Sequence, residues 1–173
     1  VDMDFAFVRG ATSSLVGDRN LSRMISLPGN LRVFYGHVLD LIGTTFNSGY
    51  LGSWVSHYNS FVPEQSYSFL TSYVQQRGNY AMATIQSQGG QAPFALAGST
   101  PITTANNLVV LSGTAPVTLR SLRINGVDWP LTWSSISQWT ARVPVDEPTT
   151  VLALEGVDWR GQPLPGAAAS VPV

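Results

Sequence analysis

The sequence predicts an α+β protein in which a helical half is followed by a small all-β sandwich. Apolar residues recur every three or four positions between residues 19 and 87, which is the period of helices with one buried face. From Asn107 onwards, short runs of β-branched and aromatic residues alternate with turn residues. Of the 173 residues, 44% are hydrophobic and 11% are charged, so the chain has enough apolar side chains to fill a core.

Three helices are expected between residues 19 and 87. The first is expected to be capped by Asn30, and the second to start near Tyr50. The third is expected to open at Pro63, because proline favours the first turn of a helix, and it carries Arg77, for which we expect an acidic partner from an adjoining element. The second helix is expected to bury one side, formed by Leu51, Trp54, Val55 and Tyr58.

The second half of the chain is expected to be all β. Residues 89–106, rich in glycine, proline and polar side chains, are expected to be a linker that runs over the surface, which leaves 1–88 as the helical part and 107–173 as the β part. Asn125-Gly126 and Arg160-Gly161 predict hairpin turns. Six short strands at this spacing are typical of an immunoglobulin-like sandwich. The expected strands are Leu108–Leu111, Val117–Ile124, Trp129–Trp133, Trp139–Val145, Thr150–Val157 and Ala168–Val173.

Four of the five tryptophans lie in the β part, where large rings fill a thin core: Trp129, Trp133, Trp139 and Trp159. The tetrapeptide Gly-Val-Asp-Trp occurs at 126–129 and again at 156–159, and we interpret both copies as the same local solution beside a hairpin turn. A carbohydrate-binding surface is an alternative interpretation of these tryptophans. It requires exposed rings that lie in one plane.

Several functional classes are excluded by composition. The net charge is −1 and no basic run is present, so the chain lacks the electrostatic surface of a nucleic-acid-binding protein. All nine cationic side chains are arginine, which excludes a phosphate-binding or Schiff-base lysine, and the absence of cysteine excludes disulfides and thiolate sites. No apolar run reaches the roughly 18 residues that a membrane-spanning helix needs, so we expect no transmembrane segment.

The acids Asp2 and Asp4 are the candidate metal ligands. They lie two positions apart in a strand-like run, so both point to the same face, while Val1, Met3 and Phe5 point to the other. Two carboxylates at this spacing can approach one Mg²⁺ ion, although two ordinary acids at a solvated strand end are an equally simple interpretation. Because the chain opens with Val inside a strand-like pattern, we expect it to be the carboxy-terminal part of a longer protein.

Several segments together resemble the CotH (spore coat protein H-like) kinase family. The run Asp-Met-Asp-Phe-Ala-Phe at 2–7 is similar to the family's Trp-Asp-Leu-Asp-x-x-Phe-Gly segment, with Val1 where tryptophan is usual and Val8 where glycine is common. The runs at 20–25, 31–38 and 72–80 resemble the family's later helices in the same order. The β part resembles immunoglobulin-like modules that follow such domains in secreted bacterial proteins.

The resemblance implies that residues 1–88 are the carboxy-terminal portion of an atypical protein kinase that uses ATP and Mg²⁺ to phosphorylate protein hydroxyls. It makes Asp2 the metal ligand and Asp4 its companion, and it implies a secreted or cell-surface bacterial protein. The family's nucleotide-binding lobe lies upstream, so the chain alone is expected to be inactive and to need that missing segment as its partner. The alternative is an extracellular structural or adhesion element, with protein contacts through the sandwich and through candidate exposed aromatics: Tyr50, Tyr58, Tyr67 and Tyr73.

Overall fold

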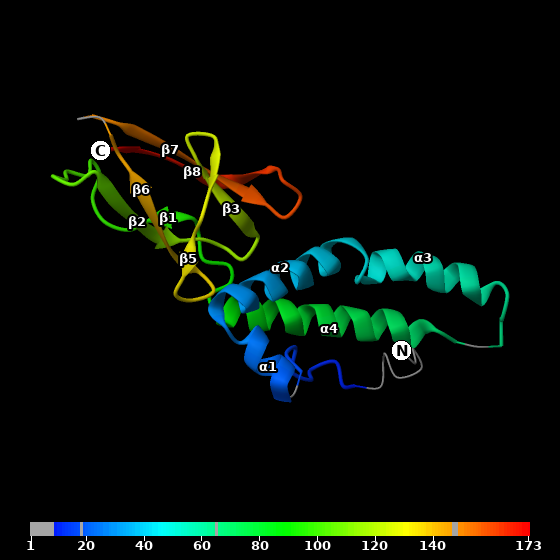
Figure 1. The fold of residues 1–173 in the computed structure, drawn as a ribbon. Coiled ribbons are helices and arrows are strands. Elements are labelled where there is room, and N and C mark those ends of the chain that lie inside the picture. Colours follow the sequence, from blue (N-terminus) through cyan, green and yellow to red (C-terminus); the bar gives the residue numbers. More distant parts are fainter. Residues whose placement is uncertain (1–8, 18, 65, 147–148) are drawn as a thin grey trace.

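The computed structural model describes residues 9–17, 19–64, 66–146 and 149–173. They form a helical arm joined to a pair of antiparallel four-stranded sheets (Figure 1). The prediction of an α+β protein, helical first and β second, is therefore confirmed.

Four helices build the arm: α1 (Arg19–Ile25), α2 (Pro28–Thr44), α3 (Ser48–Asn59) and α4 (Ser68–Ser87). The helices α2 and α3 follow one another along the same side of α4, which runs back toward the sheets (Figure 1). The arm is thus only two helices thick. The 20 residues of α4 give it a length of about 30 Å.

Two of the predicted helix starts are wrong. The helix α2 begins at Pro28 rather than at Asn30, because proline already has the backbone angle of a first turn, and the Asn30 amide instead donates to the Met24 carbonyl at 2.9 Å. The helix α4 begins at Ser68 rather than at Pro63, because the residues after Asn59 are used to reverse the chain so that α4 can pack against α3.

The sandwich consists of two antiparallel sheets. One has the strand order β1-β2-β6-β5 and the other β4-β3-β7-β8. The strands are β1 (Ala95–Leu96), β2 (Leu108–Thr114), β3 (Leu119–Ile124), β4 (Val127–Trp129), β5 (Thr132–Trp133), β6 (Gln138–Pro144), β7 (Val151–Asp158) and β8 (Pro163–Pro172).

Two features of the β part differ from the predictions. The expected strand at 129–133 is split, with β4 in one sheet and β5 in the other, because Pro130 between them has no N–H to donate to a ladder. The expected linker at 89–106 contains the strand β1. It also supplies Phe94, whose ring stacks on that of Trp139 at 6.1 Å, and Ile102, whose N–H donates to the Pro172 carbonyl at 2.9 Å.

Both predicted hairpin turns are confirmed. Asn125 and Gly126 have φ values of 52° and 81°, the left-handed pair that a type I′ turn needs between β3 and β4. Gly161 has a φ of 78° in the turn between β7 and β8. The core lies between the two sheets and includes Trp139, which is 1% exposed and donates from Nε1 to the Thr114 carbonyl at 3.1 Å.

Candidate interaction site on helix α3

The helical arm is fixed to the sandwich by a joint that is built around Arg32 of α2. This side chain is 2% exposed, and its guanidinium lies 3.6 Å above the ring of Trp133. It donates to the carbonyls of Ala115, Pro116, Leu119 and Ile136, all of which belong to the β part. Burial lowers the pKa of Arg32 to about 9, while the four carbonyl acceptors and the aromatic face favour the protonated form, so the side chain is a cation at neutral pH.

Trp159 of the β part makes a second set of contacts with α2. Trp159 donates from Nε1 to the Val117 carbonyl at 2.9 Å, and its ring lies 4.9 Å from the ring of His37 on α2. Gly36 leaves the space that the Trp159 ring fills, since a Cβ at this position would lie 2.3 Å from Nε1. The arm and the sandwich therefore share one packed interface.

A small apolar core runs through this joint. It consists of Tyr35 from α2, Ile85 from α4, and Val117 and Ile136 from the β part, all of them buried. An apolar core shared by two parts of a chain resists their relative movement more than a polar contact does. The direction of the arm relative to the sandwich is therefore set by packing, and the end of the arm is held at a defined distance from the sheets.

The helix α3 lies in the half of the arm that is remote from the joint. Its first turn is capped by Asn47, whose side chain accepts from the Tyr50 N–H at 2.9 Å. Ser48 donates to the Gln75 side chain of α4 at 2.8 Å, and Leu51 and Val55 are half-buried. None of the twelve residues of α3 is buried.

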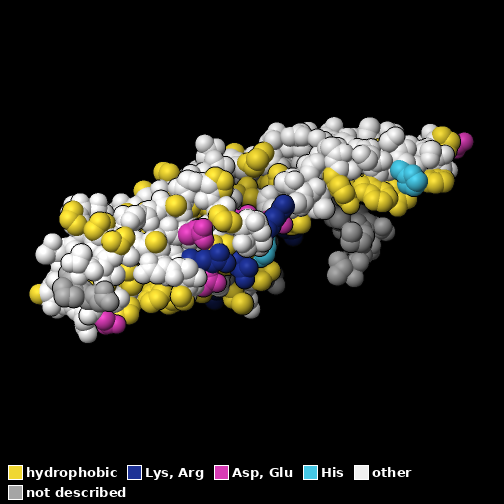
Figure 2. Space-filling model, turned by 90° about the horizontal axis from the view of Figure 1, so that it is seen from above, with side chains coloured by type: hydrophobic (Ala, Val, Ile, Leu, Met, Phe, Trp, Pro, Cys, Tyr) yellow, Lys and Arg dark blue, Asp and Glu magenta, His cyan; other side chains and the backbone are white. Residues whose placement is uncertain are grey.

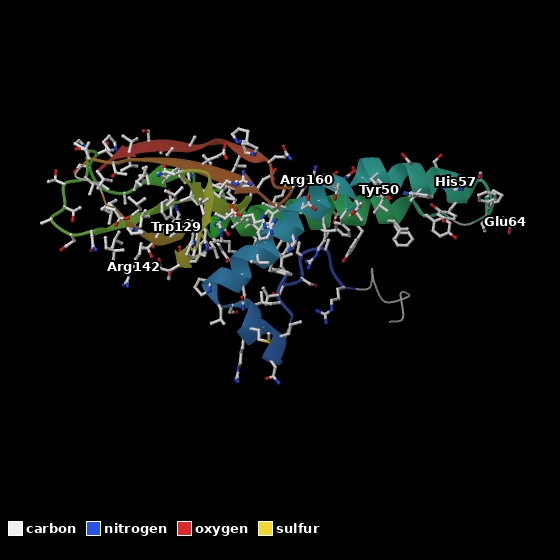
Figure 3. All side chains as sticks on the ribbon, turned by 45° about the horizontal axis from the view of Figure 1, so that its top comes forward. Tyr50, His57, Glu64, Trp129, Arg142 and Arg160 are labelled. Carbon is white, nitrogen blue, oxygen red and sulfur yellow. The ribbon has the colours of Figure 1, made fainter. Side chains whose placement is uncertain are left out.

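The exposed side of α3 and the turn after it carry a continuous row of rings, which we call the aromatic face: Tyr50, Trp54, His57 and Tyr58 from the helix, and Phe61 from the turn. Tyr50 and Trp54 are each 45% exposed, Tyr58 is 56% exposed and Phe61 is 68% exposed. Figure 2 shows hydrophobic side chains gathered around the histidine at the end of the arm, and Figure 3 shows Tyr50 and His57 along α3, with His57 on the side of Tyr50 away from Arg160. Contiguous apolar patches of this kind mark interaction sites in many soluble proteins.

The rings of the aromatic face pack against one another. The Trp54 ring lies 6.4 Å from that of Tyr50 and 6.1 Å from that of Tyr58, with the second pair stacked. His57 lies edge-on to the rings of Trp54, Tyr58 and Phe61, at 6.2, 5.5 and 5.0 Å. Because each ring restricts its neighbours, the face loses little side-chain entropy when another surface covers it.

No formal charge interrupts this surface. The α3 sequence contains no Asp, Glu, Lys or Arg, and Glu64 lies beyond its end (Figure 3). A surface with five aromatic rings and no Asp, Glu, Lys or Arg suits a protein contact, because charged groups would have to be desolvated or paired when water is excluded.

The sequence predicts this site only in part. Tyr50 and Tyr58 are exposed, as the interface interpretation requires, whereas Tyr67 and Tyr73 are half-buried. Trp54 and Tyr58 were expected on the buried side of their helix, and this prediction is wrong, because α4 contacts the neighbouring side that carries Leu51 and Val55. The signal that could have revealed the face is the spacing of 50, 54 and 58, together with 57 and 61, in a helix without charges.

The predicted metal ligands Asp2 and Asp4 lie outside the described residues. Within the described ranges, no group of three or more His, Asp or Glu side chains is placed to hold a metal ion. Arg77 was expected to pair with an acid, and the structure shows instead that its guanidinium donates to the backbone carbonyls of Ala11, Ser13 and Ser14. Arg77 therefore fastens the chain segment around residues 11–14 to α4.

The tryptophans of the β part make packing contacts and hydrogen bonds that support the fold. Trp139 fills the core, Trp133 stacks on Arg32, and Trp129 donates from Nε1 to the Arg142 carbonyl at 2.9 Å. The two Gly-Val-Asp-Trp copies each end in a tryptophan that donates to a carbonyl, Trp129 in the first and Trp159 in the second. This favours the interpretation of both copies as local structural solutions over a carbohydrate-binding surface.

The long edge strand β8 is poorly suited to pairing with another chain. Pro163, Pro165 and Pro172 have no N–H to donate, and the Pro172 carbonyl already accepts from Ile102. The alternation of the β7–β8 ladder leaves the backbone groups of Ala168 and Ser170 at the free edge. Because this stretch of free backbone groups is short, addition of a strand at β8 is a weaker candidate for a protein contact than the aromatic face.

An open groove of about 280 Å³ follows the joint, between α2 and the turn that connects β7 with β8. Arg160 and Asp40 form an ion pair there at 2.9 Å, and the Asp158 carboxylate accepts from the backbone N–H groups of Arg160 and Gln162. The charged groups of the groove thus each have a partner.

Among the described residues, no helix has the length and apolar content required to cross a bilayer.

Comparisons of the chain with protein-family models, curated proteins and solved structures gave no match.

Proposed function

We propose that the chain is a structural interaction element, in which the sandwich and the helical arm hold the aromatic face in place for contact with another protein. The observation that carries this proposal is the exposure of α3. No residue of this helix is buried, although four rings line its outer side and Phe61 follows its end. An aromatic row in water is an unfavourable surface for a helix unless a partner covers it.

The joint supports the same function. Arg32 connects α2 to the β part by hydrogen bonds to four carbonyls, the Trp159 ring packs against His37 of α2, and an apolar core is shared by the two parts. A fixed arm presents its face without the entropic cost of ordering a flexible segment. In this proposal, the sandwich is an immunoglobulin-like module that serves as the base of the arm, and the protein acts at the bacterial cell surface or outside the cell.

The experiment is site-specific photo-crosslinking in the cells that produce the protein. A photoreactive phenylalanine analogue at Tyr58 is expected to give a covalent protein adduct after illumination. The matched control is the same analogue at Val110, which is 58% exposed on β2 against 56% for Tyr58. Adducts at Tyr58 and none at Val110 support the proposal. An absence of adducts at Tyr58, or equal yields at both positions, contradicts it.

A second candidate function is the kinase fragment that the CotH resemblance implies. The two-layered arm favours a kinase fragment, because upstream parts of a complete kinase domain would pack on the helices that are exposed in this chain. Asp2 and Asp4 would contribute to binding Mg²⁺ in the complete protein, which would use ATP to phosphorylate protein hydroxyls.

This second candidate is tested with the full-length protein. ATP-dependent phosphate transfer to protein is expected to fall by orders of magnitude in Asp2→Asn and Asp4→Asn variants, since phosphoryl transfer depends on metal charge placed at the phosphates. An Asp146→Asn variant, which removes an exposed acid of the β part, is the control. Unchanged transfer in all three variants would exclude a catalytic role for the paired acids.

A further inference from the structure

We propose that the partner of the aromatic face is a second copy of this chain, with the two α3 helices antiparallel about a two-fold axis through Trp54. This inference rests on the proposed interaction function, and it names the partner.

The spacing of the aromatic residues supports a two-fold contact. Tyr50 and Tyr58 lie four residues before and four residues after Trp54. A two-fold axis at Trp54 therefore places Tyr50 of each copy opposite Tyr58 of the other, and Trp54 opposite its own counterpart. Aromatic residues then meet aromatic residues along about 12 Å of helix, so the same surface is complementary to itself.

The charge distribution also favours a second copy. In a two-fold contact, any charge near the axis meets the same charge on the partner, which is destabilising. The α3 helix has no Asp, Glu, Lys or Arg, so no such repulsion arises. A partner recognised through opposite charges would find no charge on α3 to pair with.

The area of the face is close to what a weak dimer needs. From the exposed fractions of Tyr50, Trp54, Tyr58 and Phe61, and about 200 Å² for each full aromatic side chain, the face offers about 400 Å² of exposed aromatic surface. Two copies together would bury about 800 Å² from these rings, and the surrounding helix surface brings the total toward the lower limit of about 1,200 Å² for stable interfaces. We expect a dimer with a Kd of about 10–100 μM.

Two matched double variants test the antiparallel arrangement. In Tyr50→Glu/Tyr58→Arg, each glutamate faces an arginine of the other copy, whereas in Tyr50→Glu/Tyr58→Glu, glutamates face each other. Both variants remove the same two rings, and positions 50 and 58 lie about 12 Å apart in one helix, so charges within a copy interact weakly. Sedimentation velocity is expected to show dimers at least about tenfold tighter for the Glu/Arg variant than for the Glu/Glu variant.

A second measurement uses the otherwise unsubstituted protein labelled with 5-fluorotryptophan, which gives one ¹⁹F signal for each of its five tryptophans. The Trp54 signal, assigned with a Trp54→Phe variant, is expected to shift as the protein concentration rises through the Kd. The signals of the four tryptophans in the β part are expected to stay constant.

Three outcomes would overturn the proposal of a second copy. They are equal dimerisation of the two double variants, a Trp54 signal that does not change with concentration, and an unsubstituted protein that remains monomeric up to about 1 mM, well above the expected Kd. An adduct at Tyr58 with a protein of a different mass would preserve the interaction function while excluding the second copy. The lack of any adduct at Tyr58 would overturn both.

Discussion

Alanine substitutions of the two glycines buried within α2 and α4 are predicted to change the free energy of unfolding in opposite directions. Gly36 and Gly78 both lie within helices, where replacement by alanine gains up to about 1 kcal/mol from helix propensity. A Cβ at Gly78 would lie 3.8 Å from its nearest neighbour, Ile42, which is an ordinary contact distance. We therefore expect Gly78→Ala to raise the free energy of unfolding by about 0.5–1 kcal/mol.

The same substitution at Gly36 meets the Trp159 indole. The added Cβ would lie 2.3 Å from Nε1 and 2.5 Å from Cε2, too close for any real contact. Trp159 cannot simply move away, because it donates to the Val117 carbonyl at 2.9 Å and packs against His37. Overpacking costs about 1–3 kcal/mol and the lost hydrogen bond about 1 kcal/mol, so after the helix-propensity gain we expect Gly36→Ala to destabilise the protein by about 1–3 kcal/mol.

Urea unfolding followed by tryptophan fluorescence measures both changes in free energy, and thermal unfolding followed by the same signal measures the corresponding shifts of Tm. At the size of this chain, about 2–4 °C of Tm corresponds to 1 kcal/mol, so Gly36→Ala is expected to lower Tm by about 3–10 °C and Gly78→Ala to raise it by a few degrees. If Gly36→Ala stabilises the protein as much as Gly78→Ala does, α2 does not approach Trp159 as described, and the argument for a fixed joint fails.

Three further predictions concern side chains of the arm. Arg32→Met is expected to destabilise the fold by about 3 kcal/mol, because carbonyls of the β part lose their donor, and Arg32→Lys is expected to recover only part of this loss; urea unfolding of both variants measures it. Burial raises the pKa of Tyr35, so its contribution to stability is present below the unfolded-state pKa near 10 and is lost as the pH rises through the folded-state pKa. Unfolding free energies at pH 9, 10 and 11 should therefore fall less steeply for Tyr35→Phe, and an equal slope would contradict this assignment. Arg77→Met is expected to speed limited proteolysis around residues 11–14, and an unchanged cleavage rate would show that its carbonyl contacts do not hold this segment.

The order and type of the elements could be predicted from the sequence because they depend on local patterns. The 3.6-residue periodicity identified the helical half, and Asn125-Gly126 identified its hairpin from two residues that accept a positive φ. The split at Pro130 was also present in the sequence, since a proline within a predicted central strand argues against that strand. What the sequence did not reveal is which sheet each short strand joins.

The joint and the aromatic face depend on long-range packing, which a local pattern does not contain. Arg32 looks like an ordinary polar residue of a helix, and only the fold shows that its acceptors lie more than 80 residues away. For α3, the apolar residues form a stripe about 140° wide, at 100° per residue, and periodicity alone does not tell which part of this stripe is buried. The position of α4 decides that Leu51 and Val55 face inward while Trp54 and Tyr58 remain exposed.

Oxidative footprinting of Trp54 measures whether another protein covers the aromatic face. Brief hydroxyl-radical exposure is applied to the producing cells and to the dilute purified protein, and the oxidation of Trp54 is compared with that of Met24, which is 63% exposed on α1. A several-fold lower oxidation of Trp54 in the cells, with Met24 unchanged, is the predicted result. Equal oxidation of Trp54 in both samples would mean that the aromatic face stays open to water and would contradict the proposed function.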